Sequence, residues 1–174
     1  MQLNKKIDSS FEYGDNFKIG SFCIIEKNVV VGNNVEIGNY VFLQENTYIG
    51  NNVKIDSYVR SGGNDFIGSG TILKIRTTIS PDTVIEEDVF FGPHSMVLHA
   101  TPEGEHKPVR ICKGAYIGAC SLVAPGIIIA SKVVLGAYSF ATKDLLIGGA
   151  LYFGNPAKLI REGYWKNKVI QNEQ

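Results

Sequence analysis

The chain has 174 residues, a length typical of a single domain. Hydrophobic residues make up 44% and charged residues 20%, a composition that indicates a globular protein and argues against disorder. Lys and Arg together number 17, as do Asp and Glu. The resulting net charge of zero gives no electrostatic support for binding nucleic acid or a membrane surface.

The sequence also argues against membrane insertion and secretion. No apolar run approaches the roughly 18–20 residues needed to span a bilayer. The first residues, Met1 to Asp8, include two lysines but no apolar segment behind them, so we expect no secretory signal. The three cysteines are an odd number and form no CxxC pair, which favours reduced thiols and a cytoplasmic location.

A six-residue repeat organises most of the chain. In blocks of six counted from Ile19, the first position is aliphatic or Phe in every block through Val97, except at Ser61. Looser blocks begin at Ile7 and Tyr13. The second position is often Gly, and the fifth is usually small or β-branched.

A period of six fits neither a helix nor a continuous strand. It fits a short strand followed by a turn, with the first-position side chain pointing inward. Three blocks then close one coil of about 18 residues, and stacked coils fill the interior with aliphatic ladders. We therefore predict an all-β, parallel β-helix of about seven coils. A β-sandwich is the weaker alternative, because loops of varying length would not keep one phase for so long.

The repeat is interrupted once and then ends. The phase slips by eight residues at 103–110 and resumes at Ile111. We predict that this segment is an extruded loop, and that residues 1–147 form the solenoid domain. Residues 148–174 are predicted to be a C-terminal loop followed by a short capping helix from Ala157 to about Gln171, because a solenoid end needs a cover.

The six-residue repeat resembles that of the hexapeptide-repeat acyltransferases, whose fold is a left-handed β-helix. The second half of the chain narrows the resemblance to the galactoside, maltose and sugar acetyltransferase branch. The segments that carry it are 107–119, 123–129, Gly136-Ala137-Tyr138-Ser139, Thr142-Lys143-Asp144 and Gly154-Asn155-Pro156-Ala157-Lys158. Tyr116 stands where this branch usually has Trp, and Cys112 and Ala130 stand where it has Gly.

The resemblance implies an enzyme that transfers acetyl from acetyl-CoA to a hydroxyl or amine. It also implies a homotrimer with a CoA cleft between neighbouring chains. The acceptor is expected to be a carbohydrate or a nucleotide-linked sugar, as in surface-polysaccharide biosynthesis, with O- and N-acetylation both open. An antibiotic or other xenobiotic is the alternative acceptor.

Acyl transfer needs a base for the acceptor proton, and histidine suits this role because its pKa lies near neutrality. His99 is the predicted catalytic base. It occupies a turn position immediately before the phase break, where a loop builds a wall beside the coil. The resemblance agrees, because the catalytic histidine of this branch precedes the extruded loop.

Two further residues are predicted to contact the acceptor. His106 lies within the loop, in a segment similar to the loop of serine acetyltransferases. Asp65 belongs to the least apolar block of the solenoid, Ser61 to Phe66, although a bent coil explains this block equally well. His94 occupies a turn and is assigned no role.

The cofactor-binding residues are implied by the resemblance alone. The backbone N–H of Ala119 would contact the thioester oxygen, and Ala137 and Thr142 would line the pantetheine arm. Three cations would lie toward the CoA phosphates: Lys143, Lys158 and Arg161. Their charge suits phosphate, although ordinary solvated side chains are an equal alternative.

Two other classes compete with the acetyltransferase. His94 and His99 have the spacing of a histidine pair in the γ-class carbonic anhydrases, but no histidine precedes His94 to complete three zinc ligands. We therefore expect no metal. A non-catalytic solenoid that serves as an assembly platform is the other alternative, and it leaves His99 and the loop unexplained.

Overall fold

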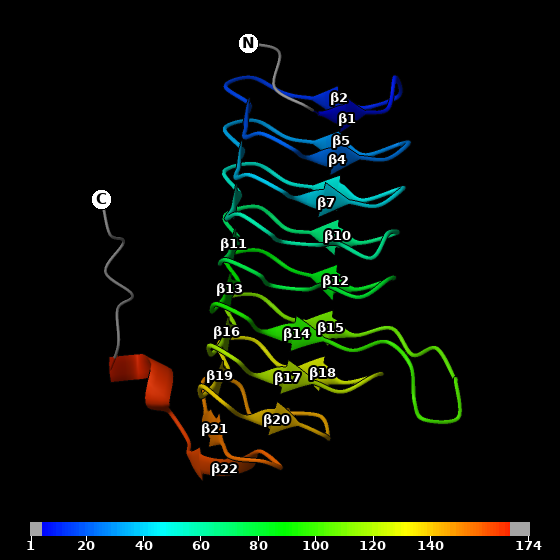
Figure 1. Cartoon of the computed structure of the whole chain (residues 1–174). Coiled ribbons are helices and arrows are strands. Elements are labelled where there is room, and N and C mark those ends of the chain that lie inside the picture. The colour runs from blue at the N-terminus through cyan, green and yellow to red at the C-terminus, as the bar shows by residue number, and fades with distance from the viewer. Residues whose placement is uncertain (1–4, 168–174) are drawn as a thin grey trace.

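The structure, a computed structural model, describes residues 5–167. The chain winds into a parallel β-helix in which short strands stack in three faces along one axis, with the N-terminal coil at the top of Figure 1. Most strands are only two residues long. Strands on one face that belong to consecutive coils pair in register, 18 residues apart except across the loop and between β19 and β21, where the spacing is 17.

We name the faces A, B and C in chain order. Face A holds β1 (Lys6–Ile7), β4 (Ile24–Ile25), β7 (Phe42–Leu43), β14 (Met96–Val97), β17 (Leu122–Val123) and β20 (Phe140–Ala141). Face B holds β2 (Glu12–Tyr13), β5 (Val30–Val31), β8 (Tyr48–Ile49), β10 (Phe66–Ile67), β12 (Val84–Ile85), β15 (Arg110–Ile111) and β18 (Ile128–Ile129). Arg60 and Thr78 bridge the two middle coils of face A.

Face C is the longest. It holds β3 (Lys18–Ile19), β6 (Glu36–Ile37), β9 (Lys54–Ile55), β11 (Ile72–Leu73), β13 (Phe90–Phe91), β16 (Tyr116–Ile117), β19 (Val134–Leu135), β21 (Leu151–Phe153) and β22 (Lys158–Arg161). Of these nine strands only β22 is antiparallel, so eight coils stack in parallel. The predicted number of coils was about seven. The structure has one more, because β21 forms a coil in a segment that was predicted to be loop.

The predicted ladders form the core. The second residue of nearly every strand is the first residue of a repeat block and points inward; Leu43, Ile67 and Leu73 are each fully buried. The fifth position of each block is buried as well, and usually supplies Val, Thr or Ser. At the turns between faces, many non-glycine residues adopt a positive φ, and Asn dominates because it tolerates this conformation.

The C-terminal segment corrects the prediction of a helix that begins at Ala157. Lys158–Arg161 instead forms β22, which turns back to pair with β21 and covers the last coil of face C. The helix is reduced to the 3₁₀ turn η1 (Tyr164–Asn167). An exposed strand edge offers unpaired backbone groups, and an antiparallel strand satisfies them directly, whereas a helix does not. The part of the predicted helix beyond residue 167 lies outside the residues that the structure describes.

Candidate active site

The loop leaves the corner that joins face A to face B, which we name the AB corner. It extends sideways from the solenoid between β14 and β15 (Figure 1). Its two arms form a small hairpin in which the Lys107 N–H donates to the His99 carbonyl over 2.8 Å, and Ala100 pairs with His106. The hairpin therefore holds His99 at a fixed backbone position on a rigid scaffold.

His99 lies at the base of this hairpin with its side chain exposed. Its ring meets the ring of His106 from the opposite arm, with 5.5 Å between centroids and an angle of 65° between the planes. The structure thus brings together two of the predicted site residues. A solvent-exposed imidazole beside a rigid strand has the access that a general base requires.

Asp82 adds a carboxylate to this pair. Its Oδ2 lies 3.4 Å from Nε2 of His106, and its backbone N–H is fixed by the Gly63 carbonyl one coil earlier, at 3.0 Å. The row Asp82–His106–His99 therefore runs from the solenoid into the loop. The sequence analysis did not find Asp82, although Pro81 next to it precedes His99 by one 18-residue coil repeat, and this spacing was the available signal.

Asp65 is buried, and its burial argues against the predicted contact with an acceptor. Its side chain is 2% exposed, and its two carboxylate oxygens accept hydrogen bonds from the N–H groups of Gly62, Gly63 and Thr83. Desolvation by burial raises its pKa to about 7 against these three hydrogen bonds, and the nearby charge of Asp82 adds to the increase. Asp65 therefore stabilises the backbone of the AB corner from inside the solenoid, on the N-terminal side of the loop.

Ala119 lies at the other edge of face A, in the corner that joins face C to face A, which we name the CA corner. In the first coils the equivalent backbone N–H groups are satisfied by side chains of the next coil: Ser21 donates to Asn39 Oδ1 at 2.7 Å, and Asn39 to Ser57 Oγ at 3.0 Å. Within residues 5–167 the Ala119 N–H has no such acceptor, because the residue one coil later is Ala137. A half-buried, unpaired N–H is the group that a developing oxyanion requires.

The coils are packed tightly at this corner. A Cβ placed on Gly92 would lie 2.5 Å from the Ala119 nitrogen, and one on Gly118 would lie 2.4 Å from the Ala137 nitrogen. The Tyr138 N–H donates to the Ala119 carbonyl over 2.9 Å and ties the two alanines together. The structure therefore brings Ala119 and Ala137 together in neighbouring coils with a fixed backbone.

The remaining predicted cofactor residues are divided between two places. Thr142 and Lys143 are exposed at the AB corner, on the same edge of face A as His99. Lys158 and Arg161 are exposed on β22, at the C-terminal end of face C. All of the predicted cofactor residues lie in coils C-terminal to the coil of His99.

His94 lies apart from His99. It occupies the CA corner with a φ of 58°, and β14 separates it from His99 at the AB corner. No group of three His, Cys, Asp or Glu side chains in the described part of the chain is arranged to hold a metal ion. His94 and His99, whose spacing resembles that of a zinc-binding pair, therefore lie at opposite edges of face A.

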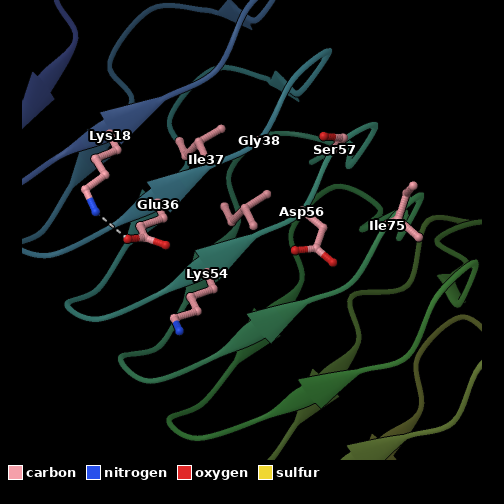
Figure 2. A pocket seen from close by; sticks show the side chains of 9 residues that line it. Lys18, Glu36, Ile37, Gly38, Lys54, Asp56, Ser57 and Ile75 are labelled. Atoms are coloured by element: carbon pink, nitrogen blue, oxygen red, sulfur yellow. Dashed lines mark hydrogen bonds and ion pairs between the residues drawn. The ribbon is translucent and has the colours of Figure 1, made fainter. Parts of the chain in front are cut away.

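A surface groove lies elsewhere, over face C and the CA corner of the N-terminal coils. Figure 2 shows Lys18, Glu36, Lys54 and Asp56 along this groove, whose volume is about 570 Å³. Lys18 pairs with Glu36 at 2.7 Å, and Asp56 pairs with Lys74 at 3.1 Å. The groove is open and balanced in charge, and it holds none of the predicted site residues.

Comparison with known proteins agrees with this architecture. The family model described as bacterial transferase hexapeptide (six repeats) matches residues 14–45. The chain carries the bacterial hexapeptide repeat. No curated protein sequence shows significant similarity to this hexapeptide-repeat chain. In the described part of the chain, no helix has the length and apolar character to cross a bilayer.

Solved structures share the fold of this hexapeptide-repeat protein at low sequence identity. The UDP-N-acetylglucosamine acyltransferase from Francisella novicida superposes with a TM-score of 0.69 at 18% identity, covering 94% of this chain and 70% of its own. The polySia-specific acetyltransferase NeuO gives 0.63 at 19%, covering 99% and 92%. The acetyltransferase domain of PglB from Neisseria gonorrhoeae in complex with acetyl coenzyme A gives 0.50 at 17%, covering 91% and 58%. The fold is thus the left-handed β-helix of hexapeptide-repeat acyltransferases.

Proposed function

We propose that this protein transfers an acetyl group from acetyl-CoA to a hydroxyl or amino group of a carbohydrate or nucleotide-linked sugar. The observation that carries the proposal is the pair of groups at the two edges of face A. His99 is an exposed base held by the loop hairpin at one edge, and the Ala119 N–H is an unpaired donor at the other. Direct acyl transfer needs a base and an oxyanion donor.

The step joins His99 of one chain to the Ala119 N–H of a neighbouring chain in the predicted trimer, because within one chain the two groups lie at opposite edges of face A. His99 accepts the proton of the acceptor O–H or N–H while the acceptor lone pair attacks the thioester carbonyl carbon. The Ala119 N–H donates to the carbonyl oxygen as it becomes negative. The C–S bond then breaks, and the proton passes from His99 to the leaving thiolate, which gives the acetylated acceptor and free CoA thiol.

The names of the similar structures support the choice of substrates. They describe an acyltransferase of UDP-N-acetylglucosamine, an acetyltransferase of polysialic acid, and an acetyltransferase domain that binds acetyl-CoA. We assign Ala137 and Thr142 to the pantetheine arm, and the exposed cations Lys143, Lys158 and Arg161 to the CoA phosphates, because phosphate favours Lys and Arg. The trimeric assembly and the cytoplasmic location remain predictions.

Thiol release from acetyl-CoA over a panel of amino sugars and hydroxyl sugars, free and nucleotide-linked, tests the proposal. His99→Ala should lower turnover at least about tenfold, the low side of what a general base contributes. Lys54→Ala is the control, because this exposed side chain lies on β9 in an N-terminal coil, remote from both His99 and Ala119, and should keep full turnover. Full turnover in folded His99→Ala would remove the base from the mechanism.

A further inference from the structure

Aromatic rings form a ladder along the CA corner of the N-terminal coils. Phe22, Tyr40 and Tyr58 occupy the same turn position in consecutive coils, each with a positive φ that turns the side chain outward. Their rings stack with centroids 4.9 and 5.0 Å apart and planes within 9° of parallel. Each ring remains close to half exposed, and the guanidinium of Arg76 continues the stack 5.5 Å from the Tyr58 ring.

A second arginine–aromatic pair lies beside this ladder on face A. Arg60 lies over the Phe42 ring with its guanidinium carbon 5.4 Å from the centroid, and its backbone pairs with Phe42 and Thr78. Arg60 and Arg76 therefore lie in adjacent rows of the same surface. We name this surface the aromatic–arginine strip; it consists of Phe22, Tyr40, Phe42, Tyr58, Arg60 and Arg76.

The strip carries positive charge without acidic neighbours. No coil has Asp or Glu at the outward position of face A, which Arg60 occupies. None has an acidic residue at the two turn positions of the CA corner that Ser57 and Tyr58 occupy. Within residues 5–167, neither Arg60 nor Arg76 forms an ion pair. On the other faces Lys18 pairs with Glu36 and Arg110 with Glu86, whereas Lys54 forms no ion pair within the described residues.

These features favour an anionic ligand with repeated hydroxyl groups. The ring faces are covered by their stacked neighbours, so a ligand meets ring edges, the hydroxyls of Tyr40 and Tyr58, and two guanidinium forks. Guanidinium groups that cation–π contacts hold in place are suited to bidentate binding of carboxylate or phosphate. The groups repeat once per coil, at about 5 Å, a spacing comparable to the length of one pyranose unit in a chain.

The position of the strip fits the acceptor side of the site. If the proposed function holds, the donor occupies the coils of Ala119 and Ala137, on the C-terminal side of His99. The strip lies on the N-terminal side of the CA corner that carries Ala119, at the opposite edge of face A from His99. Donor and acceptor must reach the thioester from different directions, so the strip lies where an acceptor chain would extend.

We propose that the aromatic–arginine strip binds a linear acidic glycan along the solenoid axis and leads one of its sugar units toward the acyl-transfer site. The proposal rests on the proposed function for the acetylation step, but not for the binding step. The groove of Figure 2 is a weaker candidate for the same ligand, because its acidic side chains Glu36 and Asp56 offset its lysines.

Calorimetric binding without acetyl-CoA tests the strip directly. The probes are oligogalacturonates from the monomer to the octamer, neutral malto-oligosaccharides of equal length, and a UDP-linked hexose. We expect affinity for the acidic probes to rise with chain length, and to fall at least about tenfold in the double variant Arg60→Gln/Arg76→Gln, which removes two charge-assisted contacts. The double variant Lys18→Gln/Lys54→Gln in the neighbouring groove is the charge-matched control and should bind normally.

Several outcomes would overturn the proposal. These are equal binding by the arginine variant, equal binding of neutral probes, or preferred binding of the UDP-linked hexose without dependence on chain length. A change in oligomeric state of the arginine variant by light scattering would show that the strip is a subunit interface instead. Thiol release separates the two proposals: acetylation of a nucleotide-linked sugar without glycan binding rejects only the strip, and glycan binding without thiol release on any acceptor rejects only the acetyltransferase.

Discussion

Asp65→Asn should change the pH dependence of stability in a way that no exposed carboxylate does. The wild-type side chain is 2% exposed, and burial raises its pKa to about 7 from an ordinary value of 3.8. Between these two values the folded protein holds a proton that the unfolded chain has released. The free energy of unfolding therefore falls as pH rises, with most of this contribution lost by pH 7.

The magnitude follows from this window. Each pH unit well between the two pKa values removes about 1.4 kcal/mol, and less as pH approaches the folded pKa, so the Asp65 contribution falls by about 2 kcal/mol from pH 5 to pH 7. Asparagine does not titrate and can still accept from Thr83. However, its amide nitrogen faces the N–H groups of Gly62 and Gly63, which costs about 1–3 kcal/mol at every pH.

Urea titrations at pH 5, 6 and 7 measure the difference between the two proteins. The variant should be less stable at pH 5, and the wild-type advantage should shrink by about 2 kcal/mol by pH 7. Asp88→Asn replaces an exposed carboxylate and should show a constant difference. A wild-type advantage that stays constant or grows with pH would refute the reasoning, because it would mean that the three N–H donors outweigh desolvation and keep Asp65 ionised.

Three further outcomes follow from the geometry. Gly92→Ala should lower turnover, measured by thiol release, at least about tenfold, because its Cβ would displace the Ala119 nitrogen that we assign to the oxyanion. Gly20→Ala is the control: its Cβ is equally crowded but lies far from Ala119, and turnover should be unchanged. Asp82→Asn should speed endoproteinase Glu-C cleavage of the loop by up to about fivefold. This is the limit for the half-exposed pair of Asp82 and His106, which contributes at most about 1 kcal/mol. Unchanged cleavage would show that Asp82 does not restrain the loop. Leu73→Ala should cost about 2–5 kcal/mol by urea unfolding, far more than Ile72→Ala on the outer side of the same strand; equal losses would contradict the inward ladder.

The repeat allowed the sequence to predict the solenoid and its inward side chains. One aliphatic residue every six positions has a single structural solution, and β11 illustrates it with Ile72 outward and Leu73 buried. The loop at 103–110 was equally visible, because an insertion must leave the coil where the phase breaks. Both predictions depend on local pattern alone.

The closing strand and the coupled side chains were beyond this kind of pattern. β22 (Lys158–Arg161) has no repeat of its own, and it forms a strand because the open edge of β21 lies beside it. The pair of Asp82 and His106 depends on how the loop folds back over the corner. The burial of Asp65 depends on a turn whose N–H groups converge on one carboxylate. Such contacts depend on how individual turns and the loop fold, which the aliphatic repeat does not encode.

The functional features occur where a ladder of the solenoid is interrupted. Where the polar ladder is complete, one coil satisfies the next, as Asn39 satisfies the N–H of Ser21. At Ala119 the side-chain acceptor of the next coil is missing, and an N–H becomes available. At Arg60 the acidic partner is missing, and a cation becomes available. In a repeat protein, positions that break a polar ladder without breaking the core are therefore the ones that sequence reading should test first for ligand binding.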